Sequence, residues 1–171
     1  VNRHKGYKKM HPGAVYQHQG KTYGVKSLNR AERIVRCEVP QRRVNWHTRV
    51  RSHKETAIIE VRASGSAFGA PVAFGRLRVT ETITGYEQRS VADNRLICVV
   101  PLDLPPLVFE TEGLWFCGPD GPRRATEDGL MHFMGSIHAL EHAGIGLMPL
   151  MVMADRNDFG GISTPMHAQL G

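Results

Sequence analysis

The first two thirds of the chain alternate between apolar and polar residues over short runs that turn residues interrupt. This alternation predicts antiparallel β-strands at residues 14–18, 22–25, 34–39 and 57–61. Gln19-Gly20 is typical of a tight hairpin turn, and proline at position 40 stops the third strand. Together these strands predict a small twisted sheet or a partly closed barrel.

A second group of strands is predicted after a polar, Arg-rich connection. Residues 64–71 are small and Gly-rich and predict a loop, and residues 72–82 alternate as a half-buried strand does. Thr84-Gly85-Tyr86 is expected to turn the chain into a partner strand near residues 87–90. Three prolines within residues 101–106 exclude a central strand there.

The apolar period then changes from two to about 3.6, which predicts a helix. Thr126, with Glu127 and Asp128 behind it, is a plausible start because acidic residues favour the first turn. One helical stripe is formed by Leu130, Phe133, Met134, Ile137, Leu140, Gly144 and Met148. The predicted fold class is α+β, with a mostly antiparallel, partly barrel-like β portion followed by a long amphipathic C-terminal helix packed on it.

The same patterns divide the chain into three segments. Residues 1–65 are expected to form a basic, small β-barrel-like module, and residues 66–125 an antiparallel β segment with a Pro-rich connection. Residues 126–171 are expected to be helical.

Charge is distributed unevenly along the chain. The net charge is +6, but Val1 to Gly65 holds 15 Lys or Arg against 4 Asp or Glu, while the rest holds 7 against 12. A basic half attracts phosphate backbones, although it could equally be a solvated face that meets an acidic neighbour. The sequence has no apolar run of membrane-spanning length. Its three cysteines, Cys37, Cys98 and Cys117, are odd in number and far apart and include no CxxC pair, so free thiols are expected.

Basic residues around an aromatic residue form the candidate nucleic-acid site. Arginine presents forked donors to phosphate, and an aromatic ring can stack on an unpaired base. The alternative is that Trp46 belongs to the core. The candidate residues are Arg42, Arg43, Trp46, Arg49, Arg51 and Lys54.

Gly20-Lys21-Thr22 has the ending of a phosphate-binding loop but not its context. That loop needs a glycine five positions before the Gly-Lys-Ser/Thr triplet, and Val15 stands there. The segment also lies at a predicted hairpin tip rather than between a strand and a helix. No catalytic residue is therefore expected in this chain, and ATP hydrolysis is not expected of it.

His138-Ala139-Leu140-Glu141-His142 has the spacing of an inverted zinc-protease motif. Residues four apart share a helix face, so the two imidazoles could share a metal ion while Glu141 served as a base. After Glu141, however, the chain contains no glutamate for a third ligand. A structural polar network of His138, Glu141, His142, Asp155 and Asp158 is therefore preferred to a metal site, with a metallohydrolase as the remote alternative.

Several stretches in order resemble one protein family. Its motifs here are His11–Gly20 with Thr22-Tyr23, Val79-Thr80-Glu81 through Tyr86, Pro101–Pro106, Thr111–Trp115, His138–His142, Asp155–Asp158 and Gly160-Gly161. Together they cover almost the whole chain and resemble the region that follows the motor domains in MrfA-like DEAD/DEAH-box DNA helicases.

This resemblance implies a larger ATP-dependent DNA helicase, with DNA repair as a typical role. It places the motor, with its ATP and Mg²⁺ sites, upstream of this chain, and it places four zinc-binding cysteines beyond Gly171. Residues 126–171 are then the helical start of a zinc-binding region, and Cys37, Cys98 and Cys117 do not match its cysteine cluster. No cofactor or metal is expected in this chain itself.

Two alternative functions are therefore considered for this chain. The first is an accessory domain that guides single-stranded DNA and buttresses the motor domains, in a cytoplasmic, nucleoid-associated protein. The second is a docking module that contacts protein and no nucleic acid. No membrane is expected as a partner.

Overall fold

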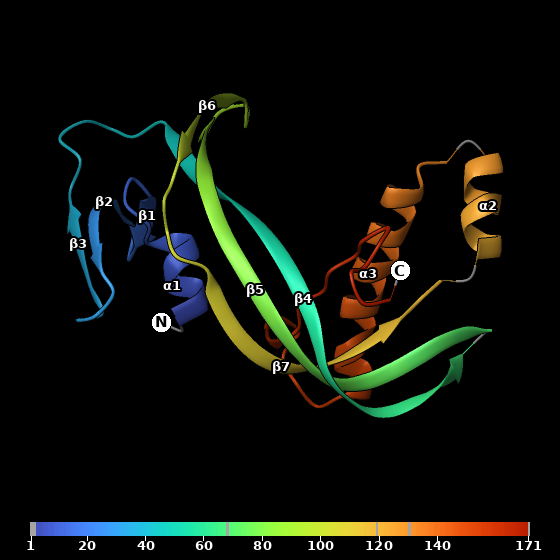
Figure 1. Ribbon diagram of the computed structural model, residues 1–171. Helices are drawn as coiled ribbons and strands as arrows, with labels where there is room; N and C mark the ends of the chain where they lie inside the picture. Colours follow the sequence, from blue (N-terminus) through green and yellow to red (C-terminus); the bar gives the residue numbers. More distant parts are fainter. Residues whose placement is uncertain (1–2, 68, 119, 130, 171) are drawn as a thin grey trace. The chain divides into compact units, whose positions relative to one another are not determined.

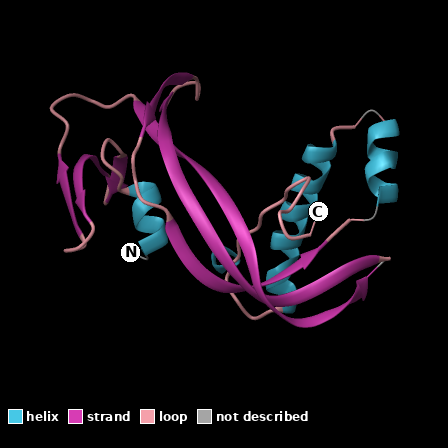
Figure 2. Cartoon of the chain, in the orientation of Figure 1, coloured by secondary structure: helices cyan, strands magenta, loops and turns pink. Residues whose placement is uncertain are grey.

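The computed structural model describes residues 3–67, 69–118, 120–129 and 131–170, with the side chains of residues 3–5 and 120–122 left out. After a short helix α1 (Arg3–Lys9), strands make up a larger share of the described residues than helices do (Figure 2). The strands are β1 (Val15–His18), β2 (Lys21–Asn29), β3 (Ile34–Glu38), β4 (Trp46–Ala67), β5 (Ala70–Ser90), β6 (Leu96–Pro101) and β7 (Leu107–Phe116). They are followed by α2 (Asp120–Asp128), α3 (Phe133–Met151) and the 3₁₀ turn η1 (Arg156–Asp158).

Two antiparallel sheets are formed. In the first, the order is β1-β2-β3, and in the second β5 pairs with β4, β6 and β7 (Figure 1). The α+β class and its mostly antiparallel character are confirmed. The partly closed barrel is wrong, because neither sheet closes on itself over the described residues.

The first sheet follows the predicted hairpin. Gln19 and Gly20 both have positive φ, at 47° and 74°, which is the backbone of the tight turn that matches strand twist. His18 consequently pairs with Lys21, and Val15 pairs with Gly24. Because Gly20 lies in this turn and Lys21 begins β2, the Gly-Lys-Thr triplet has no phosphate-loop geometry.

The second sheet differs from the prediction in strand length. Both strands extend into residues 64–71, which were expected to form a loop: β4 ends at Ala67 and β5 begins at Ala70. Gly69 lies between them with a φ of 79°. β5 also runs straight through Thr84-Gly85-Tyr86 to Ser90. Gly85 therefore lies within the strand and not in a turn. A glycine is required at this position because a Cβ atom would lie 2.5 Å from the carbonyl oxygen of Val100 on β6.

The single long amphipathic helix from Thr126 is also wrong. Thr126 lies near the end of α2, which stops before Gly129, and His132 caps α3 by accepting from the N–H of Gly135 at 3.2 Å. Among the described side chains of α3 none is buried, and Met134 and Leu140 of the expected stripe are exposed. Leu130 of that stripe lies outside the described residues.

By their internal contacts the described residues form two compact units. The first unit lies within Val1–Glu55 and Thr80–Phe109, and the second within Thr56–Val79 and Glu110–Gly171. Both are discontinuous in sequence, whereas the three segments predicted above are continuous; those segments stay a prediction.

The first unit has a small core with a polar centre. Ala14, Val25, Ile83 and Tyr86 are buried, and the fully buried Glu81 accepts from Ser52 Oγ at 2.7 Å and pairs with Lys8 Nζ at 2.8 Å. A buried carboxylate needs such partners, so this contact joins α1, β4 and β5.

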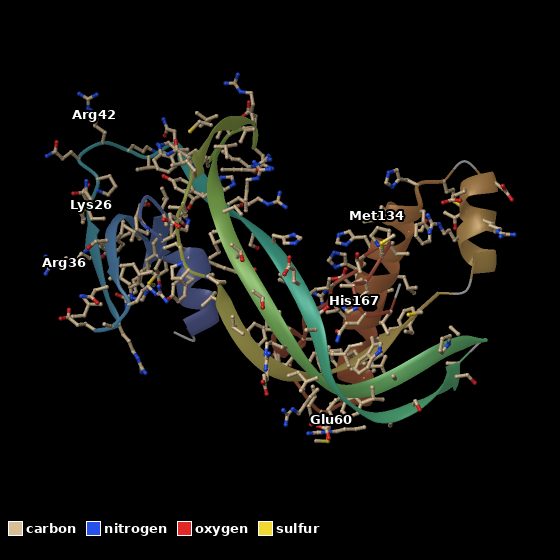
Figure 3. All side chains as sticks on the ribbon, in the orientation of Figure 1. Lys26, Arg36, Arg42, Glu60, Met134 and His167 are labelled. Carbon is tan, nitrogen blue, oxygen red and sulfur yellow. The ribbon has the colours of Figure 1, made fainter. Side chains whose placement is uncertain are left out.

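Polar contacts connect the strands and the C-terminal segment of the second unit. On its strands, Arg78 pairs with Glu110 at 3.2 Å. The segment after η1 lies along β4: His167 Nε2 is 3.1 Å from Thr56 Oγ1, and the side-chain amide of Gln169 bonds both the N–H and the carbonyl oxygen of Ile58. Figure 3 labels His167 on this segment.

Candidate nucleic-acid interface

One face of β4 carries an exposed row of basic side chains. Arg49, Arg51 and His53 are exposed, whereas the neighbouring residues Thr48 and Val50 are half-buried. Successive side chains of a strand point to opposite faces, so these three side chains share one face. We call Arg49, Arg51 and His53 the basic row.

The basic row borders a shallow depression within the first unit. Its volume is about 430 Å³, and its lining residues are Arg49, Val50, Arg51, Ser52, His53, Thr84 and Glu87. Thr84 Oγ1 donates to the backbone carbonyl of Arg51 at 3.4 Å, so β5 supplies the floor beside the row. The depression is open and polar, which suits a chain of phosphates better than an apolar ligand.

Glu87 sets the electrostatics of this depression. Arg89 Nε lies 2.7 Å from Glu87 Oε2, and that hydrogen bond is the main cause that lowers the pKa of Glu87. The charges of Arg49 and Arg51 lower the same pKa further. Glu87 therefore stays ionised and offsets part of the positive charge of the basic row.

The structure brings together only two of the six residues that the sequence nominated. Arg49 and Arg51 share the basic row, while Arg42 and Arg43 lie on the connection between β3 and β4. Figure 3 labels Arg42 on this connection. The half-buried Trp46 and Lys54 have the opposite strand parity and so belong to the other face of β4. His53 and Glu87 are site residues that the sequence did not nominate. Once residues 46–54 are known to form a strand, alternation alone adds His53 to the basic row, whereas Glu87 can be found only from the way β4 and β5 pair.

The His-Glu-His segment lies on α3 in the second unit and forms a compact cluster. His138 Nδ1 is 3.4 Å from Glu141 Oε2, and His142 Nε2 is 3.2 Å from His138 Nε2. Ser163 Oγ donates to Glu141 Oε2 at 2.6 Å. Glu141 is 14% exposed, so its carboxylate lies mostly away from water and is held by these donors.

The structure places Asp155 and Asp158 on η1. Asp155 caps this turn by accepting from the backbone N–H of Asn157 at 2.7 Å, and Asp158 ends it. The cluster member that the sequence did not nominate is Ser163, since no spacing rule connects it to Glu141. The assignment of these residues to a structural network stays a prediction.

The described side chains do not form the three-ligand site of a metalloprotease. Over the described part of the chain, no three His, Cys, Asp or Glu side chains come close enough to hold a metal ion together. Cys37 and Cys98 are exposed on β3 and β6, and Cys117 follows β7. The four-cysteine zinc site that the resemblance implies therefore has no counterpart among these residues.

No helix in the described residues is both long and apolar enough to cross a membrane.

The known proteins that this chain resembles in sequence and in structure are helicases. No protein-family model matches the chain. It is 26% identical to the ATP-dependent helicase HRQ1 of Saccharomyces cerevisiae over 147 residues and 28% identical to the hrq1 helicase of Schizosaccharomyces pombe over 151 residues. Each match covers 85% of this chain but only 13% and 14% of the two helicases, so the chain spans about a seventh of their length.

Solved structures give the same result for the fold. A crystal structure of the DUF1998 helicase MrfA bound to DNA matches all of this chain with a TM-score of 0.69 and 18% identity, over 22% of its own length. A further crystal structure of the DUF1998 helicase MrfA matches 92% of this chain with a TM-score of 0.52 and 18% identity. The predicted resemblance is thus confirmed: this chain has the fold of one region of an MrfA-like DUF1998 helicase and is similar in sequence to the Hrq1 helicases over most of its length.

Proposed function

We propose that this chain is a non-catalytic, C-terminal accessory region of an ATP-dependent DNA helicase, and that its basic row binds single-stranded DNA. The single observation that carries the DNA contact is the alignment of Arg49, Arg51 and His53 on one exposed face of β4. The proposal that the row serves a helicase rests on the similarity to MrfA and Hrq1.

The geometry of a strand suits an extended polyanion. Alternate side chains on one face of a strand are about 6.5–7 Å apart, so neighbouring members of the basic row can contact successive phosphates. Arginine gives forked, charge-assisted hydrogen bonds to phosphate oxygens, and these contacts carry no sequence preference. A region that guides DNA past a motor needs this kind of sequence-independent contact.

The motor, with its ATP and Mg²⁺ sites, and the zinc-binding cysteines belong to the rest of the proposed parent helicase. The accessory region would buttress the motor domains of the same chain while the basic row holds the strand. No step of ATP hydrolysis is assigned to residues of this chain.

The test is fluorescence anisotropy with a labelled oligo-dT strand across a salt series. The native chain is compared with Arg49→Gln/Arg51→Gln. Removing two phosphate contacts should lower the slope of log affinity against log salt by about 1.4, since each contact to a single strand contributes about 0.7. The matched control is Arg62→Gln/Arg78→Gln, which removes the same charge from arginines already paired with Glu112 and Glu110.

Three outcomes decide the proposal. A loss confined to the basic-row variant supports it. An equal loss in both variants would mean that only the net charge matters, and unchanged binding in both would remove DNA from the assigned face. Arg42→Gln/Arg43→Gln tests whether the connection before β4 adds to the site.

A docking role is the second candidate, and a separate observation favours it. The last turns of α3 expose large apolar side chains, with Leu147 at 54% and Leu150 and Met151 at 81% each. Such a patch is typical of a surface that another protein covers. If this candidate is right in place of the first, the chain should not bind oligo-dT at physiological salt but should associate with separately expressed motor domains of its parent. Leu147→Gln/Leu150→Gln should then abolish that association without changing the circular dichroism spectrum.

A further inference from the structure

We propose that His138 and His142 form a two-imidazole site for one transition-metal dication, independent of the DNA-binding role. The two residues lie one turn apart on α3, with Nε2 atoms 3.2 Å from each other. Both imidazoles are exposed, with His138 at 61%, so water can complete the coordination sphere.

The separation of the two nitrogen atoms matches a shared ion. Zinc binds imidazole nitrogen at about 2.0–2.1 Å with tetrahedral angles, which puts two such nitrogens about 3.3 Å apart. The 3.2 Å distance therefore allows both nitrogens to bind one ion once the rings turn so that both Nε2 lone pairs point at it. A rigid helix fixes both rings from one element, so little freedom is lost on binding.

Glu141 prepares His138 for this role. Its carboxylate lies 3.4 Å from His138 Nδ1, which favours the proton on Nδ1 and leaves the lone pair on Nε2 directed at His142. Ser163 Oγ donates to the same carboxylate at 2.6 Å and holds it in place. Glu141 is thus a positioning residue that supports the first ligand from behind, as carboxylates behind zinc-bound histidines do.

Metal binding requires His142 to move a proton from Nε2 to Nδ1, and exchange with water is sufficient for this change. When no ion is bound, the N–H at His142 Nε2 can donate to His138 Nε2, since one of the two facing nitrogens must carry hydrogen. On binding, His142 exchanges its proton with solvent and takes the Nδ1–H tautomer, so that the Nε2 lone pairs of both rings are free for the ion. Neither neutral ring changes its charge.

Ligand type selects the class of ion. Imidazole suits Zn²⁺, Cu²⁺ and Ni²⁺, whereas Mg²⁺ and Ca²⁺ prefer oxygen ligands. With two nitrogens and water, affinity should follow the general order in which Cu²⁺ binds most tightly. This site needs no cysteine and is separate from the four-cysteine zinc cluster that the resemblance implies.

Isothermal titration of the whole chain with ZnCl₂ at pH 7.5 tests the site. The native chain should bind one ion per molecule, His138→Ala and His142→Ala should each lose that binding, and MgCl₂ should give no signal. His18→Ala is the matched control, because His18 is an exposed histidine on β1 and should leave binding unchanged. Glu141→Gln should weaken binding by roughly 10–100-fold, the usual effect of removing a carboxylate behind a ligand.

A second measurement separates binding from folding. Zinc should raise the unfolding temperature of the native chain and the His18→Ala variant but not of His138→Ala or His142→Ala, all of which should keep the native circular dichroism spectrum. The site is refuted if the native chain binds no zinc, or if both alanine variants on α3 bind it with native affinity.

Discussion

His11 is a fully buried ionisable side chain in the core of the first unit. Its Nδ1 donates to the carbonyl oxygen of Pro12 at 3.0 Å, and its ring lies 4.6 Å from the ring of Tyr86, centroid to centroid. Its Nε2 has no hydrogen-bond partner among the described residues. Burial lowers the pKa of His11 below 6.5, and the bond to Pro12 only partly opposes that shift.

The first prediction follows from this lowered pKa. In the unfolded chain His11 takes up its proton near pH 6.5, while in the folded chain it does so only at lower pH. The unfolded state therefore binds more protons between these values, so the stability that is fully present above pH 6.5 is lost as the pH falls through this window. Urea unfolding from pH 7.5 to 5 should show the loss, and His11→Phe should reduce it.

Gly13 gives a second prediction at the same scale. Its φ is 83°, and an added Cβ would lie 2.2 Å from Tyr86 Oη. Gly13→Ala should lower the free energy of unfolding by about 2–4 kcal/mol, because left-handed backbone strain adds to overlap with a buried ring. Gly20→Ala, at φ 74° with open space around it, is the control and should cost only about 1–2 kcal/mol in the same urea titration.

At the scale of elements, α3 and the segment after η1 meet at Gly161. A Cβ there would lie 2.6 Å from Cγ of Glu141 and 2.9 Å from Cδ1 of Ile145, so the segment approaches the helix closely. Ser163 then reaches the carboxylate of Glu141. This contact attaches the segment to an otherwise exposed helix.

The third prediction compares two adjacent glycines. Gly161→Ala should separate the segment from α3 and cost about 1–3 kcal/mol, because the added methyl overlaps Glu141. Gly160→Ala meets nothing within 4 Å and should stay within about 0.5 kcal/mol of native. Faster amide hydrogen exchange over residues 155–170 in Gly161→Ala alone is the expected result; equal exchange in both variants would contradict the role of this contact.

Elements differ in how far their sequence predicts them. The first hairpin was predictable because Gln19-Gly20 demands one turn type. Strands β4 and β5 were predicted too short because glycine in a strand resembles a turn signal, whereas Gly75 and Gly85 are there for close approach of the neighbouring strand. The break between α2 and α3 was not predicted, because Thr126, Glu127 and Asp128 resemble a helix start directly before the apolar stripe, whereas they form the last turn of α2.

The candidate site was predictable to a similar degree. The basic composition of residues 42–54 was visible, but their division between two faces depends on strand parity, and the sequence placed a connection there. Ser163 and Glu87 reach their partners only through the fold.

At the scale of the whole molecule, charge governs the proposed contact with DNA. Glu87 is the acidic side chain that lines the depression beside the basic row. Glu87→Gln should strengthen oligo-dT binding roughly two- to five-fold at low salt, in line with the modest size of exposed charge interactions, and the gain should shrink as salt rises. Glu32→Gln, on an exposed acid away from the depression, should change the anisotropy titration less; an equal gain would show that net charge alone controls binding.

The bond between Gln169 and Ile58 has a consequence for solubility. The side-chain amide satisfies both backbone groups of Ile58, as one residue of an adjacent strand would do. An open strand edge is a template on which another chain can add itself, and long β-hairpins are prone to such growth. Gln169 therefore covers the backbone of β4 at Ile58, and Gln169→Leu should leave that part of the edge open and increase self-association measured by light scattering.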